Sequence, residues 1–105
     1  MLRRECERIG RDPATLRVTE EAVLALAPTR ARADEARATA ERRFGGPGWG
    51  FAAGGYCGTP EEVVARIRAR ARLGVQGVVF FLHDRAEPET LRLLADEVVP
   101  AVRDL

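Results

Sequence analysis

The only histidine of the chain, His83, is the clearest candidate for chemistry. It follows an apolar run at residues 78–82 and stands directly before Asp84, so an imidazole and a carboxylate lie together where that run ends. Such a pair can orient a substrate or transfer a proton. The competing interpretation is a polar loop start that only keeps water at the end of the element, and residue type and position leave both interpretations open.

A nucleophilic or metal site is disfavoured. A nucleophilic arrangement of Cys57, His83 and Asp84 has no nucleophile elbow or oxyanion-hole motif beside it, and the same residues lack metal-ligand spacing. We therefore expect no metal centre. Cys6 and Cys57 are far apart in sequence and form no CxxC motif, which predicts two free thiols in a reducing cytoplasm. The absence of lysine excludes a P-loop lysine and a Schiff-base lysine.

The glycine-rich segment 44–58 carries three aromatic candidates, Trp49, Phe51 and Tyr56. Its many glycines disfavour a helix or a central strand, because glycine loses much backbone entropy on folding, so we expect a loop. One interpretation is a lid whose rings close over a cofactor or an apolar substrate. The favoured alternative is a disordered connector, since a lid needs a pocket beneath it. The glycines do not follow the GxGxxG spacing of a dinucleotide site.

Arginines alternate along residues 66–72, while the formal net charge of the chain is only +1. At helical spacing these arginines spread around the helix, which favours a solvated face over a phosphate-binding patch. We expect Glu62 and Arg66 to form an ion pair one helical turn apart. A nucleic-acid-binding domain usually has a clear basic excess, so we expect no nucleic-acid partner.

The first half of the chain predicts a helix, a strand and a second helix. An apolar stripe predicts a helix over residues 2–9, ended by Gly10. Alternating and then continuous apolar residues favour a strand over residues 15–26, although glutamate, alanine and leucine also suit a short helix over 20–26. Residues 31–43 predict a helix whose alanine face buries little area.

The second half predicts a helix, a strand and a last helix. Residues 59–62, Thr-Pro-Glu-Glu, have the spacing of a capping box with proline at the first helical position, and the helix ends at Gly74. The apolar run 78–82 is typical of a strand buried on both faces of a parallel sheet. Pro88 begins the last helix, which Pro100 kinks or ends.

This order, α-β-α-loop-α-β-α, predicts a single α/β domain over residues 1–105 with parallel strands. Two parallel strands leave raw edges and would show an apolar face to water, so we expect self-association or a partner chain that covers the edges. The chain is too short for a complete (β/α)₈ barrel of about 250 residues. No apolar run approaches the roughly 18 residues of a membrane span, and no signal peptide is visible, so we expect a cytoplasmic protein without membrane contact.

Three segments carry a resemblance to a known family. They are CERIGRDP at residues 6–13, GTPEEVV at 58–64 and ETLRLLADEVVP at 89–100. In this order they resemble the C-terminal part of the luciferase-like flavin-dependent oxidoreductases, the bacterial luciferase superfamily, many of which use a deazaflavin. The segment 44–57 matches the family least.

The resemblance implies a partial (β/α)₈ barrel, about its last two β/α units, with residues 15–26 as strand seven and 76–82 as strand eight. It implies oxidoreductase or monooxygenase chemistry with FMN or a deazaflavin on a small organic substrate. Most flavin contacts of the family lie in earlier strands, so the resemblance implies a truncated chain that is not catalytic alone. It assigns no catalytic or cofactor-binding residue.

Two other functions stay open. Exposed strand edges suit a non-catalytic α/β module that self-associates or completes the barrel of a partner. A small arginine-rich nucleic-acid binder is the third hypothesis, and the low net charge disfavours it.

Overall fold

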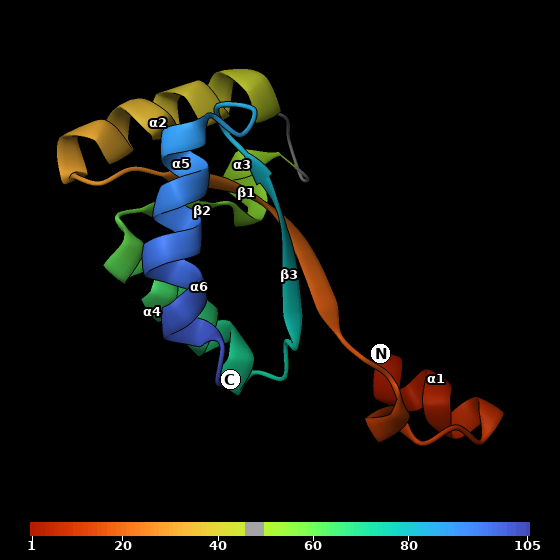
Figure 1. The fold of residues 1–105 in the computed structure, drawn as a ribbon. Helices are drawn as coiled ribbons and strands as arrows, with labels where there is room; N and C mark the ends of the chain where they lie inside the picture. The colour runs from red at the N-terminus through yellow and green to blue at the C-terminus, as the bar shows by residue number, and fades with distance from the viewer. Residues whose placement is uncertain (46–49) are drawn as a thin grey trace.

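A three-stranded parallel sheet with helices on both faces forms the body of the protein (Figure 1). This computed structural model describes residues 1–45 and 50–105. The strands are β1 (Thr19–Leu26), β2 (Tyr56–Gly58) and β3 (Gly77–Leu82), in the order β2-β1-β3. The predicted α/β class and the parallel pairing are confirmed. The strand predicted over residues 15–26 is confirmed over 19–26, which rules out the helical alternative for 20–26, but its start is wrong because Thr15 ends a 3₁₀ turn.

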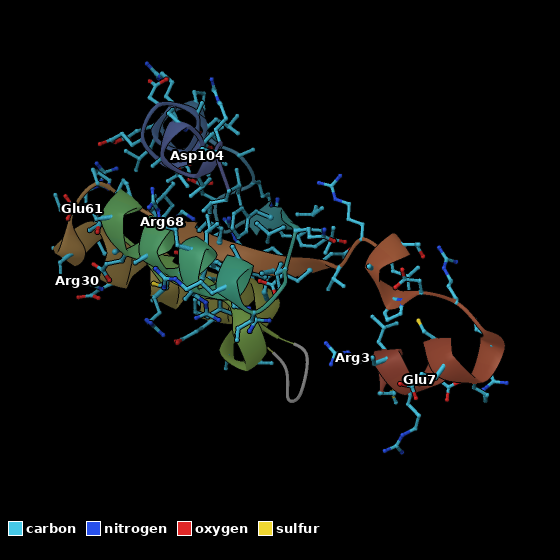
Figure 2. The ribbon with its side chains drawn as sticks, turned by 90° about the horizontal axis from the view of Figure 1, so that it is seen from below. Arg3, Glu7, Arg30, Glu61, Arg68 and Asp104 are labelled. Atoms are coloured by element: carbon cyan, nitrogen blue, oxygen red, sulfur yellow. The ribbon has the colours of Figure 1, made fainter. Side chains whose placement is uncertain are left out.

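The N-terminal helix α1 (Leu2–Ile9) lies on an arm away from the sheet (Figures 1 and 2). The chain leaves it through Gly10, whose φ of 73° is the left-handed conformation of a helix C-cap. A 3₁₀ turn, Pro13–Thr15, follows, and the Asp12 carboxylate caps it by accepting a hydrogen bond from the Ala14 amide at 2.9 Å. The predicted helix and its end are thus confirmed.

Helices α2 (Arg30–Phe44) and α3 (Phe51–Gly54) cover one face of the sheet. The helix α2 begins where the Thr29 hydroxyl accepts a hydrogen bond from the Arg32 amide at 3.3 Å. Its alanine face, predicted to bury little area, packs close against the sheet because alanine lets the two backbones approach. The core on this face consists of Ala25, Ala36, Ala40 and Phe51.

The expectation that residues 44–58 form only a loop is wrong for its second half. Residues Phe51–Gly54 form α3, and Tyr56–Gly58 form β2, which pairs in parallel with Leu24–Leu26 of β1. Glycine disfavours a long central strand, but β2 is three residues long and lies at an edge of the sheet, where that cost is small. The sheet therefore has three strands where the sequence predicted two.

Helix α4 (Pro60–Arg72) and the C-terminal helical segment cover the other face. That segment runs through α5 (Pro88–Leu93), a π-helical turn η2 (Leu94–Val98) and α6 (Val99–Val102). Pro100 explains the π turn. Proline has no N–H to donate and its ring clashes with the carbonyl four residues earlier, so the regular helical hydrogen bond cannot form there. The core on this face holds the largest buried side chains, Leu24, Leu26, Tyr56, Val63 and Val98.

The start of α4 differs in detail from the predicted capping box. The Thr59 hydroxyl donates to the Glu62 carboxylate at 3.2 Å and caps no backbone N–H of the helix. Glu62 forms its ion pair with Arg30 of α2, where the sequence predicted Arg66. Gly58 is required here, because its φ is 146° and a Cβ would lie 2.8 Å from the Glu62 carboxylate.

Strand β3 is not buried on both faces as its apolar run predicted. It lies at the edge of the sheet, and Val79 and Phe81 are 57% and 50% exposed. Helices α2 and α3 cover the strands β1 and β2 on that side and leave this part of β3 open. The expected apolar face toward water is confirmed.

Helices on both faces follow from the strand order. The chain moves from β1 to β2 in one direction across the sheet and from β2 to β3 in the other. Because crossovers between parallel strands are right-handed, the connecting helices α2 and α4 fall on opposite faces. This is the arrangement of an open, doubly wound sheet.

Candidate functional site

A cavity of about 490 Å³ lies where β1 and β3 end, between α2 and α5. We call it the carboxyl-end crevice. Leu26, Ala27, Ala36 and Leu93 form its apolar wall, and His83, Asp84 and Thr90 are among its polar groups. Helices leave β1 and β3 toward opposite faces at this point, which is where open α/β sheets bind their ligands.

The backbone of His83 is fixed from both sides. Its N–H donates to the Leu24 carbonyl at 3.0 Å, which extends the pairing of β3 with β1 by one residue. Its carbonyl accepts a hydrogen bond of 2.8 Å from the Arg43 guanidinium, at the last turn of α2. The sheet and α2 therefore hold the imidazole at one place in the crevice.

The His83 ring is buried and incompletely hydrogen-bonded. The residue is 8% exposed, and among the described residues Nδ1 has no hydrogen-bond partner. Nε2 lies 3.7 Å from an Asp84 carboxylate oxygen, which is too far for a hydrogen bond. That oxygen accepts a hydrogen bond of 2.5 Å from the Thr90 hydroxyl, so Asp84 is already oriented by α5. The predicted neighbours His83 and Asp84 are thus brought together, and among the described residues neither ring nitrogen of His83 makes a hydrogen bond.

A bidentate ion pair bounds the crevice on its outer side. Arg32 of α2 donates to both carboxylate oxygens of Glu89 at 2.8 and 3.0 Å, and this bond lowers the pKa of Glu89. Both side chains are exposed, so the pair orients α2 against α5 more than it stabilises the fold. The loop behind it contains Arg85 and Ala86 at φ of 60° and 66°, a strained backbone for residues other than glycine.

Comparison with known proteins identifies no relative. No protein-family model matches the chain, and no curated protein is significantly similar to it. The resemblance of the three segments to the luciferase-like family therefore stays a prediction.

The opposite end of the sheet holds a second polar group that the sequence did not predict. The Tyr56 hydroxyl donates to Glu20, which also accepts hydrogen bonds from Arg70 at 2.8 and 3.2 Å. The Arg66 guanidinium lies 4.6 Å from the centre of the Tyr56 ring. Burial and the bond to Glu20 raise the pKa of Tyr56 to about 12, while Arg70 and then Tyr56 lower the pKa of Glu20. We call these four residues the tyrosine network.

This network corrects the interpretation of the arginine run as a purely solvated face. Arg66 and Arg70 contact Tyr56 and Glu20, and Arg68 donates to the Ala101 carbonyl at 2.6 Å. The sequence signal was available, because residues 66 and 70 lie one turn apart on one side of a helix. Their partners come from distant parts of the chain, which spacing along a helix does not predict.

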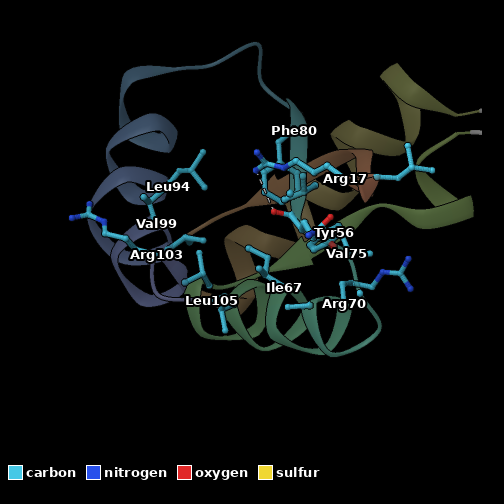
Figure 3. Close-up of a pocket in the computed structure, with 18 of the residues that line it drawn as sticks. Arg17, Tyr56, Ile67, Arg70, Val75, Phe80, Leu94, Val99, Arg103 and Leu105 are labelled. Atoms are coloured by element: carbon cyan, nitrogen blue, oxygen red, sulfur yellow. Dashed lines mark hydrogen bonds between the residues drawn. The ribbon is translucent and has the colours of Figure 1, made fainter. Parts of the chain in front are cut away.

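A larger groove of about 1210 Å³ lies beside the tyrosine network, between the sheet, α4 and the C-terminal helices (Figure 3). Its wall is mainly apolar, with Ile67, Phe80, Leu94 and Val99 turned into it. Its tyrosine already has a polar partner in Glu20. This groove therefore offers an apolar surface, whereas the smaller crevice is lined by His83, whose Nδ1 is buried without a partner among the described residues.

The three aromatic candidates of segment 44–58 do not line the crevice. Phe51 is 4% exposed and packs with Ala25, Ala36 and Ala40, with the Arg37 guanidinium 5.7 Å from its ring centre. Tyr56 lies in the core of the other face, edge-on to Phe80. Both rings thus have packing roles, and their contact with a cofactor stays a prediction. Trp49 lies outside the described residues.

Cys57 also lies apart from His83 and Asp84, since it does not line the crevice. Its thiol contacts the Ala33 carbonyl at 3.7 Å, and burial raises its pKa, which makes it a poor nucleophile. Within residues 1–45 and 50–105, no cluster of histidine, cysteine and acidic side chains could hold a metal. In the same ranges, no helix is both long and apolar enough to pass through a membrane.

Proposed function

We propose that the carboxyl-end crevice binds a flavin or deazaflavin and that the protein takes part in luciferase-like oxidoreductase or monooxygenase chemistry. The observation that carries the proposal is the buried Nδ1 of His83, which has no partner among the described residues. A buried polar atom without a hydrogen bond is costly, which supports a ligand in the crevice as its partner once the imidazole turns toward that ligand.

The residues of the crevice fit such a group. Its volume of about 490 Å³ lies within the range of about 300–1,000 Å³ that is usual for small-molecule sites. Most of its exposed lining is polar, which suits the polar edge of a flavin, while Leu93 supplies an apolar contact and His83 a polar one. When bound, the flavin supplies the hydride or oxygen chemistry. His83 would orient the ring or the substrate, or hold a proton, at Nδ1.

The resemblance of three segments to the luciferase-like family supports the choice of ligand. Two of them border the sheet at matching places: residues 58–64 lead from β2 into α4, and residues 89–100 form the helical segment that follows β3. Barrels and open sheets both bind ligands at the carboxyl ends of their strands, so the crevice suits either architecture.

A (β/α)₈ barrel would require a different placement of the helices. In a (β/α)₈ barrel all the helices lie on the outer side, so α2 and α4 would share one face and other strands would close the sheet. The present arrangement has α2 and α4 on opposite faces. The proposal therefore depends on the crevice and the motifs. It places this chemistry in the cytoplasm, in keeping with the free thiols of Cys6 and Cys57.

The test is a titration of FMN, and separately of a 5-deazaflavin, with the full chain, followed by fluorescence anisotropy of the flavin. We expect saturable but weak binding, in the high micromolar to millimolar range, because the crevice is open and contacts one side of the ring. The variant His83→Leu should weaken binding on the order of tenfold, which corresponds to the loss of one good hydrogen bond.

Tyr56→Phe is the matched control, since it also removes one polar group from a buried ring but at the other end of the sheet. It should leave flavin affinity unchanged. The proposal is wrong if neither flavin binds at millimolar concentration. It is also wrong if His83→Leu binds flavin as tightly as the unchanged chain and the control Tyr56→Phe do.

A further inference from the structure

Strand β3 has an unprotected edge. In the described sheet it pairs with β1 alone, so the N–H and C=O groups along its other side have no strand partner. Proteins usually protect such edges with a charge, a proline or a bulge. The sequence of β3, GVVFFL, contains neither a charged residue nor a proline. Its edge is therefore suited to accept another strand.

The same strand also exposes apolar side chains. Val79 and Phe81 point to one face of the sheet and are 57% and 50% exposed. Their neighbours on β1 are Glu21 and Val23, which pair with them in register. An exposed edge and an exposed apolar pair thus coincide on one strand, which is the combination that strand-to-strand association buries.

We propose that two copies of the chain pair antiparallel through β3, about a two-fold axis at Phe80. This goes beyond the proposed function and does not depend on it. In this register Val79 of each copy faces Phe81 of the other. Such pairs of a β-branched and an aromatic residue stabilise antiparallel sheets. One strand supplies both members of each pair, so the surface is complementary to itself, as a two-fold interface requires.

The charges at the two ends of β3 favour a second copy in the antiparallel direction. Arg17 lies at the beginning of the strand, where its guanidinium reaches the Gln76 carbonyl at 3.5 Å. Asp84 follows the other end. Antiparallel pairing about Phe80 brings the start of β3 in each copy to the end of β3 in the other, so Arg17 of one copy approaches the end of the strand that Asp84 follows in the other. A parallel partner would instead place ends of the same charge side by side.

The experiment is size-exclusion chromatography with light scattering, over a range of concentrations of the full chain. We expect a dimer that dissociates on dilution. Phe81→Lys should raise the dissociation constant by at least about tenfold, because it places a charge in the apolar pair. Leu73→Lys is the matched control, since Leu73 is 74% exposed but lies outside β3, and it should leave the dimer intact.

Two further variants keep the test decisive. Circular dichroism shows whether Phe81→Lys is folded, and Val79→Lys replaces it if it is not. Arg17→Glu should weaken the dimer, because it places a negative charge near the acidic end of β3 in the second copy.

A chain that stays monomeric at every concentration overturns the inference, as do open aggregates or equal dissociation constants for Phe81→Lys and Leu73→Lys. A dimer that Arg17→Glu leaves unchanged overturns the antiparallel register. A monomer that still binds flavin would leave the proposed function standing.

Discussion

The two ends of the sheet differ in whether their buried polar groups are hydrogen-bonded. At the amino end, the hydroxyl of Tyr56 donates a hydrogen bond to Glu20, and Arg70 donates to the same carboxylate. At the carboxyl end, the ring of His83 is almost as deeply buried, yet its Nδ1 has no partner among the described residues. The polar group at the amino end is hydrogen-bonded within the chain, and the one at the carboxyl end is where we propose that a ligand binds.

This difference separates a structural polar cluster from a candidate site. A satisfied network strengthens the fold, because its members would be costly to leave unpaired. An unsatisfied group does the reverse and lowers stability until a ligand reaches it. The two ends should therefore respond differently to substitution: the amino end in stability, and the carboxyl end in binding.

The largest effect is expected from Tyr56→Ala. It removes a ring that is 2% exposed and packs edge-on against Phe80, and it leaves Glu20 without its hydroxyl donor. Like other large aromatic truncations, it should lower the free energy of unfolding by about 3–5 kcal/mol. Urea denaturation followed by circular dichroism measures this, and a loss below about 1 kcal/mol would remove Tyr56 from the core.

Tyr56→Phe keeps the ring and removes only the hydroxyl group. The expected loss is about 1 kcal/mol, the usual net value of one hydrogen bond. The same urea experiment gives the value, and Phe80→Leu serves as a control that keeps the hydroxyl but changes the ring contact. If Tyr56→Phe is as stable as the unchanged chain, the bond to Glu20 contributes nothing and the contrast between the ends fails.

Alkaline titration tests the same hydroxyl group without a substitution. The pKa of Tyr56 is raised to about 12 from an ordinary value of about 10, so the folded state holds this proton more tightly than the unfolded state. The stabilisation is complete below the unfolded pKa and is lost as the pH rises toward 12. Tyrosinate absorbance follows it cleanly, because the chain has one tyrosine. Ionisation at the ordinary pKa in the folded chain would contradict the network.

The smallest change in stability is expected from His83→Leu. It removes a buried nitrogen that has no partner among the described residues, and the apolar wall of the crevice accepts a leucine, so the chain should be as stable or slightly more stable. Thermal unfolding measures this. A clear loss of stability would mean that His83 is a structural residue like Tyr56.

The sequence predicted the elements better than their pairing. The helix ended by Gly10 and most of the strand predicted over 15–26 follow from local patterns, and the structure confirms the helix and the strand from Thr19 onward. The strand β2 was missed because three residues among glycines carry no period, and only its pairing with β1 makes it a strand. The order of strands across the sheet depends on contacts between distant residues, which local patterns do not contain.

The residues of the candidate site could be predicted from the sequence, but not the contacts that hold them in place. Residue type and position were enough to select His83 and Asp84. The contacts that set them in place, from Arg43 and Thr90, join residues that are 40 and 6 positions apart and depend on how α2 and α5 meet the sheet. The tyrosine network was hidden for the same reason, since Glu20 and Arg70 are 50 positions apart.

The most direct test of the central claim uses the fact that His83 is the only histidine of the chain. Its ring gives one set of histidine signals in a nuclear magnetic resonance spectrum, and FMN or a 5-deazaflavin is added while these signals are followed. The account predicts a saturable shift of the His83 ring signals, with little change in those of the Tyr56 ring. Unmoved His83 signals at millimolar flavin, or a larger shift at Tyr56, would contradict it.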